Sequence, residues 1–377
     1  MIMTNKVPKI FILSMLQLPE IERKTAFKIL SQVDFLMSSS TDFFQFIKEQ
    51  SIRLNLPLFT RRDFDSSLRK AEEILVKSKR NDVKILSYYD EEYPELLKKT
   101  TDPPILLNYK GNLDSILTKP SVAIIGTRNA SPYGQKYGRS LSRECSQYGF
   151  NIVSGLALGC DTAGHLGAID VNGTTTAVLA HGLDRIYPKE NKYLADRILE
   201  KSGLLISEYF IYQKPLPDFF VERDRIQAGL SLGTIVIETD IKDRSMHTIN
   251  FTQEYGRMLG CVNFPAEKRS EVTDDGNRML ISQRNSYSIY EKNELIEFLN
   301  LLKSRQLKES IAENISGYSI KDESNKLEDQ EADVLPVVID SSTKPNEIDY
   351  LIAQIQKRNP AGVIKSPHPK KESKKKN

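Results

Sequence analysis

The stretch that decides the fold is Ile152 to Ile169, IVSGLALGCDTAGHLGAI. Its first residues, with Asn151 before them, form an uninterrupted apolar run that is typical of the end of a buried strand. Gly155 to Gly159 then predict a tight turn, and Asp161 opens a run of small residues spaced as in a helix. The sequence therefore predicts a strand, a glycine turn and a helix N-terminus in direct succession.

A glycine turn that leads into a helix can bind an anion. The glycines let a ligand approach the backbone, and the first helical amides point outward with the positive end of the helix dipole. Phosphate is the anion that suits such a site best. The same glycines are equally compatible with close packing of the helix on the strand. The spacing is not G-x-G-x-x-G, so the dinucleotide fingerprint does not apply.

Strand-like and helical stretches alternate around this turn. The strand-like runs are apolar throughout, as expected of strands that are buried on both faces. They cover residues 122–126, 151–155, 174–180, 204–209, 233–239 and 260–264. We therefore predict an α/β domain over residues 81–305, with a Rossmann-like, doubly wound, mostly parallel sheet whose ligand lies at the carboxyl ends of the strands.

The two ends of the chain differ from this middle part. Residues 1–80 have apolar positions at helical spacing and predict a helical N-terminal domain. Residues 16–30 within it could form a degenerate SAM/HhH-like helix pair that grips DNA, but Glu20 and Glu22 stand where such turns need glycine, which favours plain domain packing. A helix over 291–305 closes the α/β domain. Residues 306–377 predict an acidic linker, a short amphipathic helix near 346–358 and a flexible lysine-rich tail.

Composition excludes several classes of protein. The net charge is only +3 over 377 residues, so any nucleic-acid binding must come from a local basic patch. No apolar run reaches the roughly 18 to 20 residues of a membrane helix, and we expect a cytoplasmic protein with no membrane contact. The three cysteines and four histidines have no disulfide or metal-ligand spacing, so we expect no metal and no cofactor.

Cationic side chains follow several strands at the predicted ligand edge. With Tyr187, Phe219 and Phe220 between them, they suit a single strand of nucleic acid, because cations follow phosphates while aromatic rings stack on bases. The five cations are Arg128, Arg185, Lys189, Arg223 and Arg225, and we expect the last two on a loop shortly before a helix. Ion pairs with Glu222, Asp224 or Glu238 are the structural alternative for Arg223 and Arg225.

The signal for catalysis is weak. His165 lies near Ser154 and Asp161, but no nucleophile-elbow motif accompanies them, so we assign no catalytic residue and expect no enzyme. His247, at the start of an expected helix, either donates to a phosphate or merely belongs to the helix cap. The pattern therefore favours a binding protein.

An ordered series of motifs between Ile85 and Tyr290 carries a resemblance to a known family. The motifs are YDEEYPELL, DPPILLNYKGN, VAIIGTRNASPYG, SGLALGCDTAGHLGAI, GLDRIYPKEN, ISEY, ERDRIQAGLS and DDGNRMLI. In this order they resemble the DNA-processing protein A (DprA/Smf) family. The resemblance implies a Rossmann-type protein that binds single-stranded DNA without catalysis, forms a homodimer and helps to load a RecA-type recombinase during natural transformation.

The resemblance also implies which residues contact DNA. It assigns phosphate contacts to Arg128, Ser154, Gly155, Lys189, Arg223 and Arg225. The positions of further residues in the expected loops add four members to this predicted phosphate-binding set, namely Gly159, Arg185, Asn191 and His247.

Three departures identify a divergent member of the family. Residues 244–247, Arg-Ser-Met-His, replace the usual Arg-Ser-Gly-Ser turn, and Asp224 stands where asparagine is usual. The winged helix found after the sheet in many members is replaced by the acidic linker, short helix and lysine-rich tail.

A second class of function stays open. A SLOG-type Rossmann domain would bind or hydrolyse a small nucleotide derivative in the same crevice, in stress or anti-phage signalling. Residues 229–239, GLSLGTIVIET, faintly resemble the turn of nucleoside-monophosphate phosphoribohydrolases but lack the paired glycines and the preceding proline.

Overall fold

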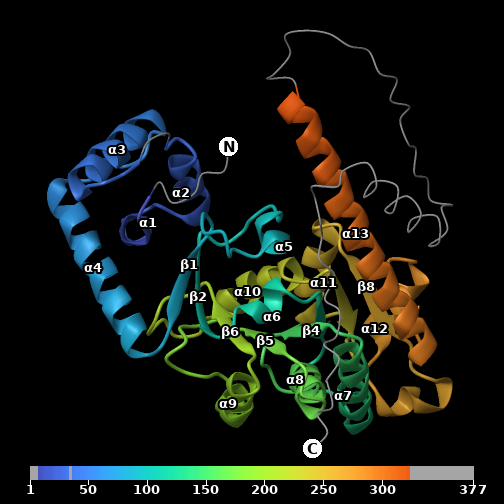
Figure 1. The fold of residues 1–377 in the computed structure, drawn as a ribbon. Coiled ribbons are helices and arrows are strands. Elements are labelled where there is room, and N and C mark those ends of the chain that lie inside the picture. The colour runs from blue at the N-terminus through green and yellow to red at the C-terminus, as the bar shows by residue number, and fades with distance from the viewer. Residues whose placement is uncertain (1–6, 34–35, 323–377) are drawn as a thin grey trace, which may run out of the picture. The chain divides into compact units, whose positions relative to one another are not determined.

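The structure is a computed structural model that describes residues 7–33 and 36–322 (Figure 1). Contacts within the chain group the described residues up to Ile315 into one compact unit. The predicted helix near 346–358 and the lysine-rich tail lie outside the described residues.

The α/β part is built on one nine-stranded sheet of order β1-β2-β6-β5-β4-β3-β7-β8-β9 (Figure 1). The pairs from β6 to β9 along this order are parallel, whereas β1 pairs with β2, and β2 with β6, antiparallel. The strands are β1 (Lys84–Ser87), β2 (Leu106–Gly111), β3 (Ser121–Ile125), β4 (Asn151–Ser154), β5 (Thr175–Val178), β6 (Leu204–Ser207), β7 (Gly233–Val236), β8 (Met258–Val262) and β9 (Tyr287–Ile289).

This topology confirms the predicted fold class. Strand β3 pairs with β4 on one side and with β7 on the other, so the chain order reverses there, and the carboxyl end of β3 is the switch point of a doubly wound sheet. Strand β9 was not predicted, because three residues that include Tyr287 and Ser288 give no apolar run.

Helices cover both faces of the sheet. Val122 and Ile124 of β3 pack in the core with α7 and α13, and Ala123 and Ile125 pack on the opposite face with α11 and α12. The helices of the α/β part are α5 (Glu95–Lys98), α6 (Asp114–Leu117), α7 (Pro132–Gln147), α8 (Cys160–Asp170), α9 (Lys192–Glu200), α10 (Pro217–Gly229), α11 (Ser245–Glu254), α12 (Asp275–Ser282) and α13 (Lys292–Asp322).

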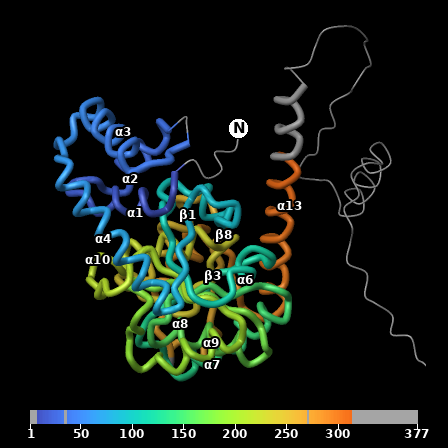
Figure 2. The backbone as a smooth tube through the Cα atoms, turned by 60° about the vertical axis from the view of Figure 1, so that its left-hand side comes forward, coloured from blue at the N-terminus to red at the C-terminus, as the bar shows by residue number. Residues whose placement is uncertain are grey.

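Helices α7 and α8 lie side by side in both views (Figures 1 and 2). Their close approach depends on Gly167, because a Cβ at this position would lie 2.2 Å from the carbonyl oxygen of Arg139. The hydroxyl of Ser142 on α7 donates to the carbonyl oxygen of Gly164 on α8 and ties the two helices together.

The N-terminal residues form four helices with an apolar core of their own. They are α1 (Lys9–Met15), α2 (Arg23–Leu30), α3 (Ser40–Arg53) and α4 (Arg61–Arg80). Phe11, Phe43 and Phe64 pack together in this core, which extends to Ile105 and Leu106 at the edge of the sheet.

Helix α2 is also tied to the α/β part by charge. Arg23, next to the turn where a DNA-gripping hairpin was considered, pairs with Asp102 and with Glu208. These contacts favour the domain-packing interpretation of residues 16–30, and the domain boundary at residue 80 stays a prediction.

The closing helix is longer than predicted. We expected it over 291–305, but α13 runs from Lys292 to Asp322. The residues after 305 include no glycine or proline before Gly317, and Arg305 pairs with Glu309 one turn later, so the helix continues. Within the described residues, no helix has both the length and the apolar character needed to cross a bilayer.

Candidate functional site

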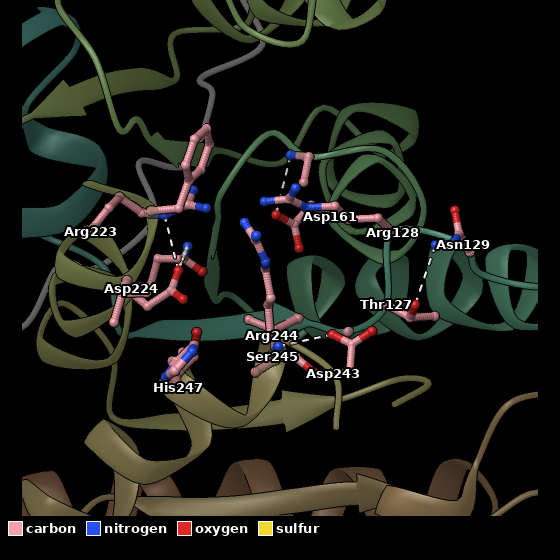
Figure 3. Close-up of a pocket in the computed structure, with 17 residues that line it drawn as sticks. Thr127, Arg128, Asn129, Asp161, Arg223, Asp224, Asp243, Arg244, Ser245 and His247 are labelled. Atoms are coloured by element: carbon pink, nitrogen blue, oxygen red, sulfur yellow. Dashed lines mark hydrogen bonds and ion pairs between the residues drawn. The ribbon is translucent and has the colours of Figure 1, made fainter. Parts of the chain in front are cut away.

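A pocket of about 330 Å³ opens at the carboxyl end of β3, where the strand order reverses (Figure 3). Its walls come from the loop after β3, from α10 and from the start of α11. Three arginines and three aspartates face it, namely Arg128, Arg223, Arg244, Asp161, Asp224 and Asp243. The predicted location of the ligand therefore coincides with a real cavity, which carries both signs of charge.

The glycine turn holds a carboxylate of its own chain. The backbone amides of Gly155 and Ala157 donate to Oδ2 of Asp161 at 3.1 Å and 3.2 Å. Asp161 is buried, and this desolvation raises the pKa of its carboxyl group, although the nearby Arg223 opposes the shift. The amide of Gly155, which belongs to the predicted phosphate-binding set, is thus engaged inside the protein, together with that of Ala157.

The other turn residues have structural partners as well. The hydroxyl of Ser154 is fully buried and donates to the carbonyl oxygen of Ile124 at 2.6 Å. Gly159 has a φ of +77°, and a Cβ there would lie 2.4 Å from the carbonyl oxygen of Thr127. Asn191 is buried, and its Nδ2 donates to the carbonyl oxygen of Leu156 at 2.8 Å. These three residues shape the turn from within.

Arg223 lines the pocket but is only 4% exposed. Its Nη1 donates to the carbonyl oxygens of Gly155 at 2.7 Å and Val178 at 2.6 Å, and its Nε pairs with Asp224 at 3.1 Å. This pairing is the structural alternative considered from the sequence. Arg223 therefore positions the ends of β4 and β5 against α10.

Asp224 is a buried acid beside the pocket. Burial raises the pKa of its carboxyl group to about 7, with Asp161 adding to the shift and Arg223 and Arg128 opposing it. The net charge of the pocket therefore changes near neutral pH.

Arg225, a member of the predicted phosphate-binding set, does not line the pocket. It is 3% exposed, donates to the carbonyl oxygen of Asp102 at 2.8 Å and pairs with Glu208, which also pairs with Arg23. We expected residues 223 and 225 on a loop before a helix, but both lie within α10. Residues two positions apart on a helix are rotated by about 200° around its axis, so the side chains of Arg223 and Arg225 point to different sides of α10.

A cation and two aromatic rings lie together at the edge of the pocket. The guanidinium group of Arg128 lies 5.2 Å from the ring centroid of Phe220, and that ring lies 5.8 Å from the ring of Tyr187. Tyr187 is 47% exposed, and Lys189 is exposed two residues later. We call Arg128, Phe220 and Tyr187 the stacking array.

Phe219 and Arg185, which were also predicted at this surface, have other partners. Phe219 stacks instead on Tyr209, with 3.9 Å between the ring centroids. Arg185 is half-buried and pairs with its neighbour Asp184 at 2.7 Å.

The start of α11 supplies a cation that the sequence analysis missed. Arg244 is exposed and extends into the pocket, as Arg128 does from the loop after β3 (Figure 3). His247, which was predicted, is exposed and lines the same pocket. The position of Arg244 in the loop between β7 and α11, at the ligand edge of the sheet, was the available signal.

His165 is enclosed in the core. It is fully buried, its Nδ1 lies 2.7 Å from the hydroxyl of Thr175, and burial lowers its pKa to about 3. In the part of the chain that the structure describes, no group of three or more histidine, cysteine or acidic side chains is arranged to hold a metal ion.

Comparison with known proteins gives consistent matches. The family model described as DNA recombination-mediator protein A matches residues 84–300. Protein Smf of Synechocystis is 38% identical over 226 residues, which are 56% of this chain and 56% of that protein. DNA processing protein DprA of Streptococcus pneumoniae is 43% identical over 171 residues, 45% of this chain and 60% of that protein. The chain thus spans little more than half the length of these relatives.

Solved structures match as well. The X-ray structure of DNA processing protein A from Streptococcus pneumoniae aligns with a TM-score of 0.62 and 29% identity, over 79% of this chain and 98% of that one. DNA processing protein A from Helicobacter pylori aligns with a TM-score of 0.51 and 29% identity, over 59% of this chain and 96% of that one. That second structure gives insight into the unique single-stranded DNA binding mode of the Helicobacter pylori protein.

Proposed function

Because the chain belongs to the DNA recombination-mediator protein A family, we propose that it binds single-stranded DNA at the carboxyl edge of its sheet and catalyses no reaction there. The single-stranded DNA binding mode described for the Helicobacter pylori protein supports this proposal. The pocket at the carboxyl end of β3 and the exposed residues beside it form the binding surface.

The observation that carries the proposal is the stacking array. The exposed ring of Tyr187 and the half-buried ring of Phe220 offer stacking surfaces to bases of any sequence, and the adjacent guanidinium group of Arg128 attracts a phosphate. Stacking of one base on an aromatic ring contributes about 1–3 kcal/mol, which is enough for useful affinity when several bases bind. The array thus favours a polymer over an isolated anion.

The direct phosphate contacts fall to the exposed cations. These are Arg128, Lys189 and Arg244, which line or adjoin the pocket, and the ring of His247 offers a hydrogen-bond donor beside them. Arg223 and Asn191 act by positioning the glycine turn, because they donate to the carbonyl oxygens of Gly155 and Leu156. The proposal thus keeps the solvent-exposed members of the predicted phosphate-binding set and adds Arg244.

We extend the proposal to the cellular role implied by the family. The bound strand would be handed to a RecA-type recombinase in the cytoplasm by a homodimer of this chain, as in natural transformation. Purified protein should speed the assembly of recombinase filaments on DNA coated with single-strand binding protein, and sedimentation should give twice the chain mass. A monomer that leaves filament assembly unchanged would contradict this extension.

Isothermal calorimetry with two kinds of ligand tests the core proposal. An oligothymidine and a panel of mononucleotides are titrated into wild-type protein and into Arg128→Ala. We expect the oligonucleotide to bind, the mononucleotides to bind far more weakly and Arg128→Ala to lose about tenfold in oligonucleotide affinity. Tight binding of one mononucleotide without oligonucleotide binding would favour the small-nucleotide class instead.

A further inference from the structure

A second basic hollow lies on the outer side of the helix pair α7 and α8. It measures about 420 Å³ and is lined by Lys136, Arg139 and Arg143 of α7, with Thr162 of α8 opposite. The three cations are spaced three and four residues apart, so they share one face of α7. The proposed DNA-binding surface does not include this hollow.

The charge of the hollow is positive and fixed. Arg139 donates to Asp170 through Nε and Nη2, both at 2.6 Å, and Arg143 donates to the same carboxylate through Nη2 at 3.0 Å. These arginines lower the pKa of Asp170 to about 2, so it stays ionised and holds both guanidinium groups in place. One carboxylate against three cations leaves two positive charges at neutral pH. Lys136 is exposed.

The hollow adjoins the proposed binding surface. The hydroxyl of Thr162 donates to the carbonyl oxygen of Ala157 at 2.8 Å, and Ala157 lines the pocket at β3. On the other side, the amide of Gln135 donates to the carbonyl oxygen of Ala130 at 2.8 Å, two residues after Arg128. A strand that leaves the pocket past Arg128 therefore meets the hollow next.

The dimensions and charge suit a chain of phosphates. Arg143 follows Lys136 by seven positions on the helix. This is a rise of about 10 Å, which corresponds to about two or three phosphate spacings of a single strand. The cations of the hollow lie in a row on an open surface, and this arrangement gives each phosphate of a polymer a weak contact.

We propose that the hollow between α7 and α8 is a phosphate track on which a single strand bound at the β3 pocket continues. This inference rests on the proposed function and deepens it by naming the surface along which the bound strand continues. Lys136, Arg139 and Arg143 would contact successive phosphates, without regard to base sequence.

Fluorescence anisotropy with two lengths of oligothymidine, about 4 and about 16 nucleotides, tests the track. The variants are Lys136→Glu, Lys136→Arg and, as a matched control, Lys119→Glu. Lys119 is exposed and precedes β3, at the opposite edge of the sheet. Circular dichroism verifies that each variant is folded.

We expect Lys136→Glu to weaken binding of the long oligonucleotide about tenfold at low salt and to reduce its salt dependence, because phosphate contacts are lost. Lys136→Glu should bind the short oligonucleotide as wild type does. Lys136→Arg and Lys119→Glu should match wild type with both lengths. Equal affinity of Lys136→Glu and wild type for the long oligonucleotide would overturn the track alone, as would an equal loss with both lengths. Failure of wild type to bind either length would overturn the proposed function and the track together.

Discussion

The carboxylate of Asp161 accepts a hydrogen bond from the backbone amide of Gly155 at 3.1 Å, so the anion held by the glycine turn belongs to the protein itself. Ala157 donates to the same oxygen. A strand-turn-helix unit that resembles a phosphate site is thus closed by an internal anion, and we propose that the exposed cations around it make the contacts with DNA.

Asp161→Ala should destabilise the fold. The substitution leaves the buried amide of Gly155 and the half-buried amide of Ala157 without an acceptor, a loss of about 1–3 kcal/mol in the free energy of unfolding. Urea denaturation measures this loss, and Asp161→Asn, which keeps an acceptor oxygen, should lose less. The exposed Asp218→Ala serves as the control. An unchanged denaturation midpoint for Asp161→Ala would show that the turn does not depend on this carboxylate.

Tyr187 should contribute to DNA binding through its ring. Tyr187→Ala removes one ring of the stacking array and should weaken oligonucleotide binding about 5- to 150-fold, the equivalent of roughly 1–3 kcal/mol. Tyr187→Phe keeps the ring and should bind like wild type. Anisotropy titrations at one salt concentration make the comparison, and equal losses in both variants would assign the effect to the hydroxyl instead.

DNA affinity should depend on pH through Asp224. The pKa of its carboxyl group is raised to about 7, so the pocket gains a negative charge as the pH rises through neutrality. Affinity for a phosphodiester should therefore fall between about pH 6 and pH 8, and Asp224→Asn should remove this part of the pH dependence. Parallel pH profiles for the two proteins would exclude Asp224 as the titrating group.

Asp224 should also affect stability, with a defined sign. The folded state raises the pKa above its ordinary value of 3.8, so the native protein holds this proton more tightly than the unfolded chain. The contribution favours folding at low pH and is lost as the pH rises from about 4 through about 7. Denaturation of Asp224→Asn should show a gain of about 1–3 kcal/mol over wild type at about pH 8 and less at about pH 5.

Arg225 should matter for stability rather than for DNA. It belongs to a buried ion-pair network with Glu208, Asp102 and Arg23 that joins α10 to α2. Arg225→Ala removes one cation from two half-buried carboxylates that keep Arg23 as a partner, and it should cost about 1–3 kcal/mol of unfolding free energy. The folded fraction should bind oligonucleotides as wild type does. Normal stability with lost binding would return Arg225 to the DNA-binding set.

The sequence predicted the sheet because buried parallel strands have a simple pattern. Residues 122–125 are apolar throughout since both faces of β3 are covered, and the same holds for 152–153 of β4. The edge strand β9 has no such pattern, and the end of α13 has no breaker residue to mark it.

The site was predicted less completely, because side-chain direction depends on the structure around it. Arg128 lies where the sequence places it, directly after β3. Arg223 and Arg225 look equivalent as a pair but diverge once both are helical. The closure of the glycine turn by Asp161 could not be predicted, since the spacing of six residues from Gly155 has no regular structure behind it.

The most direct test of the account is the salt dependence of oligonucleotide binding by wild type and Arg128→Ala. Anisotropy titrations over a series of salt concentrations give the slope of log Kd against log salt for each protein. We predict strong salt dependence for wild type, and for Arg128→Ala weaker binding with a slope smaller by about one phosphate contact, for oligonucleotides of any sequence. Binding by wild type that does not respond to salt, or no binding at low salt, would contradict the account.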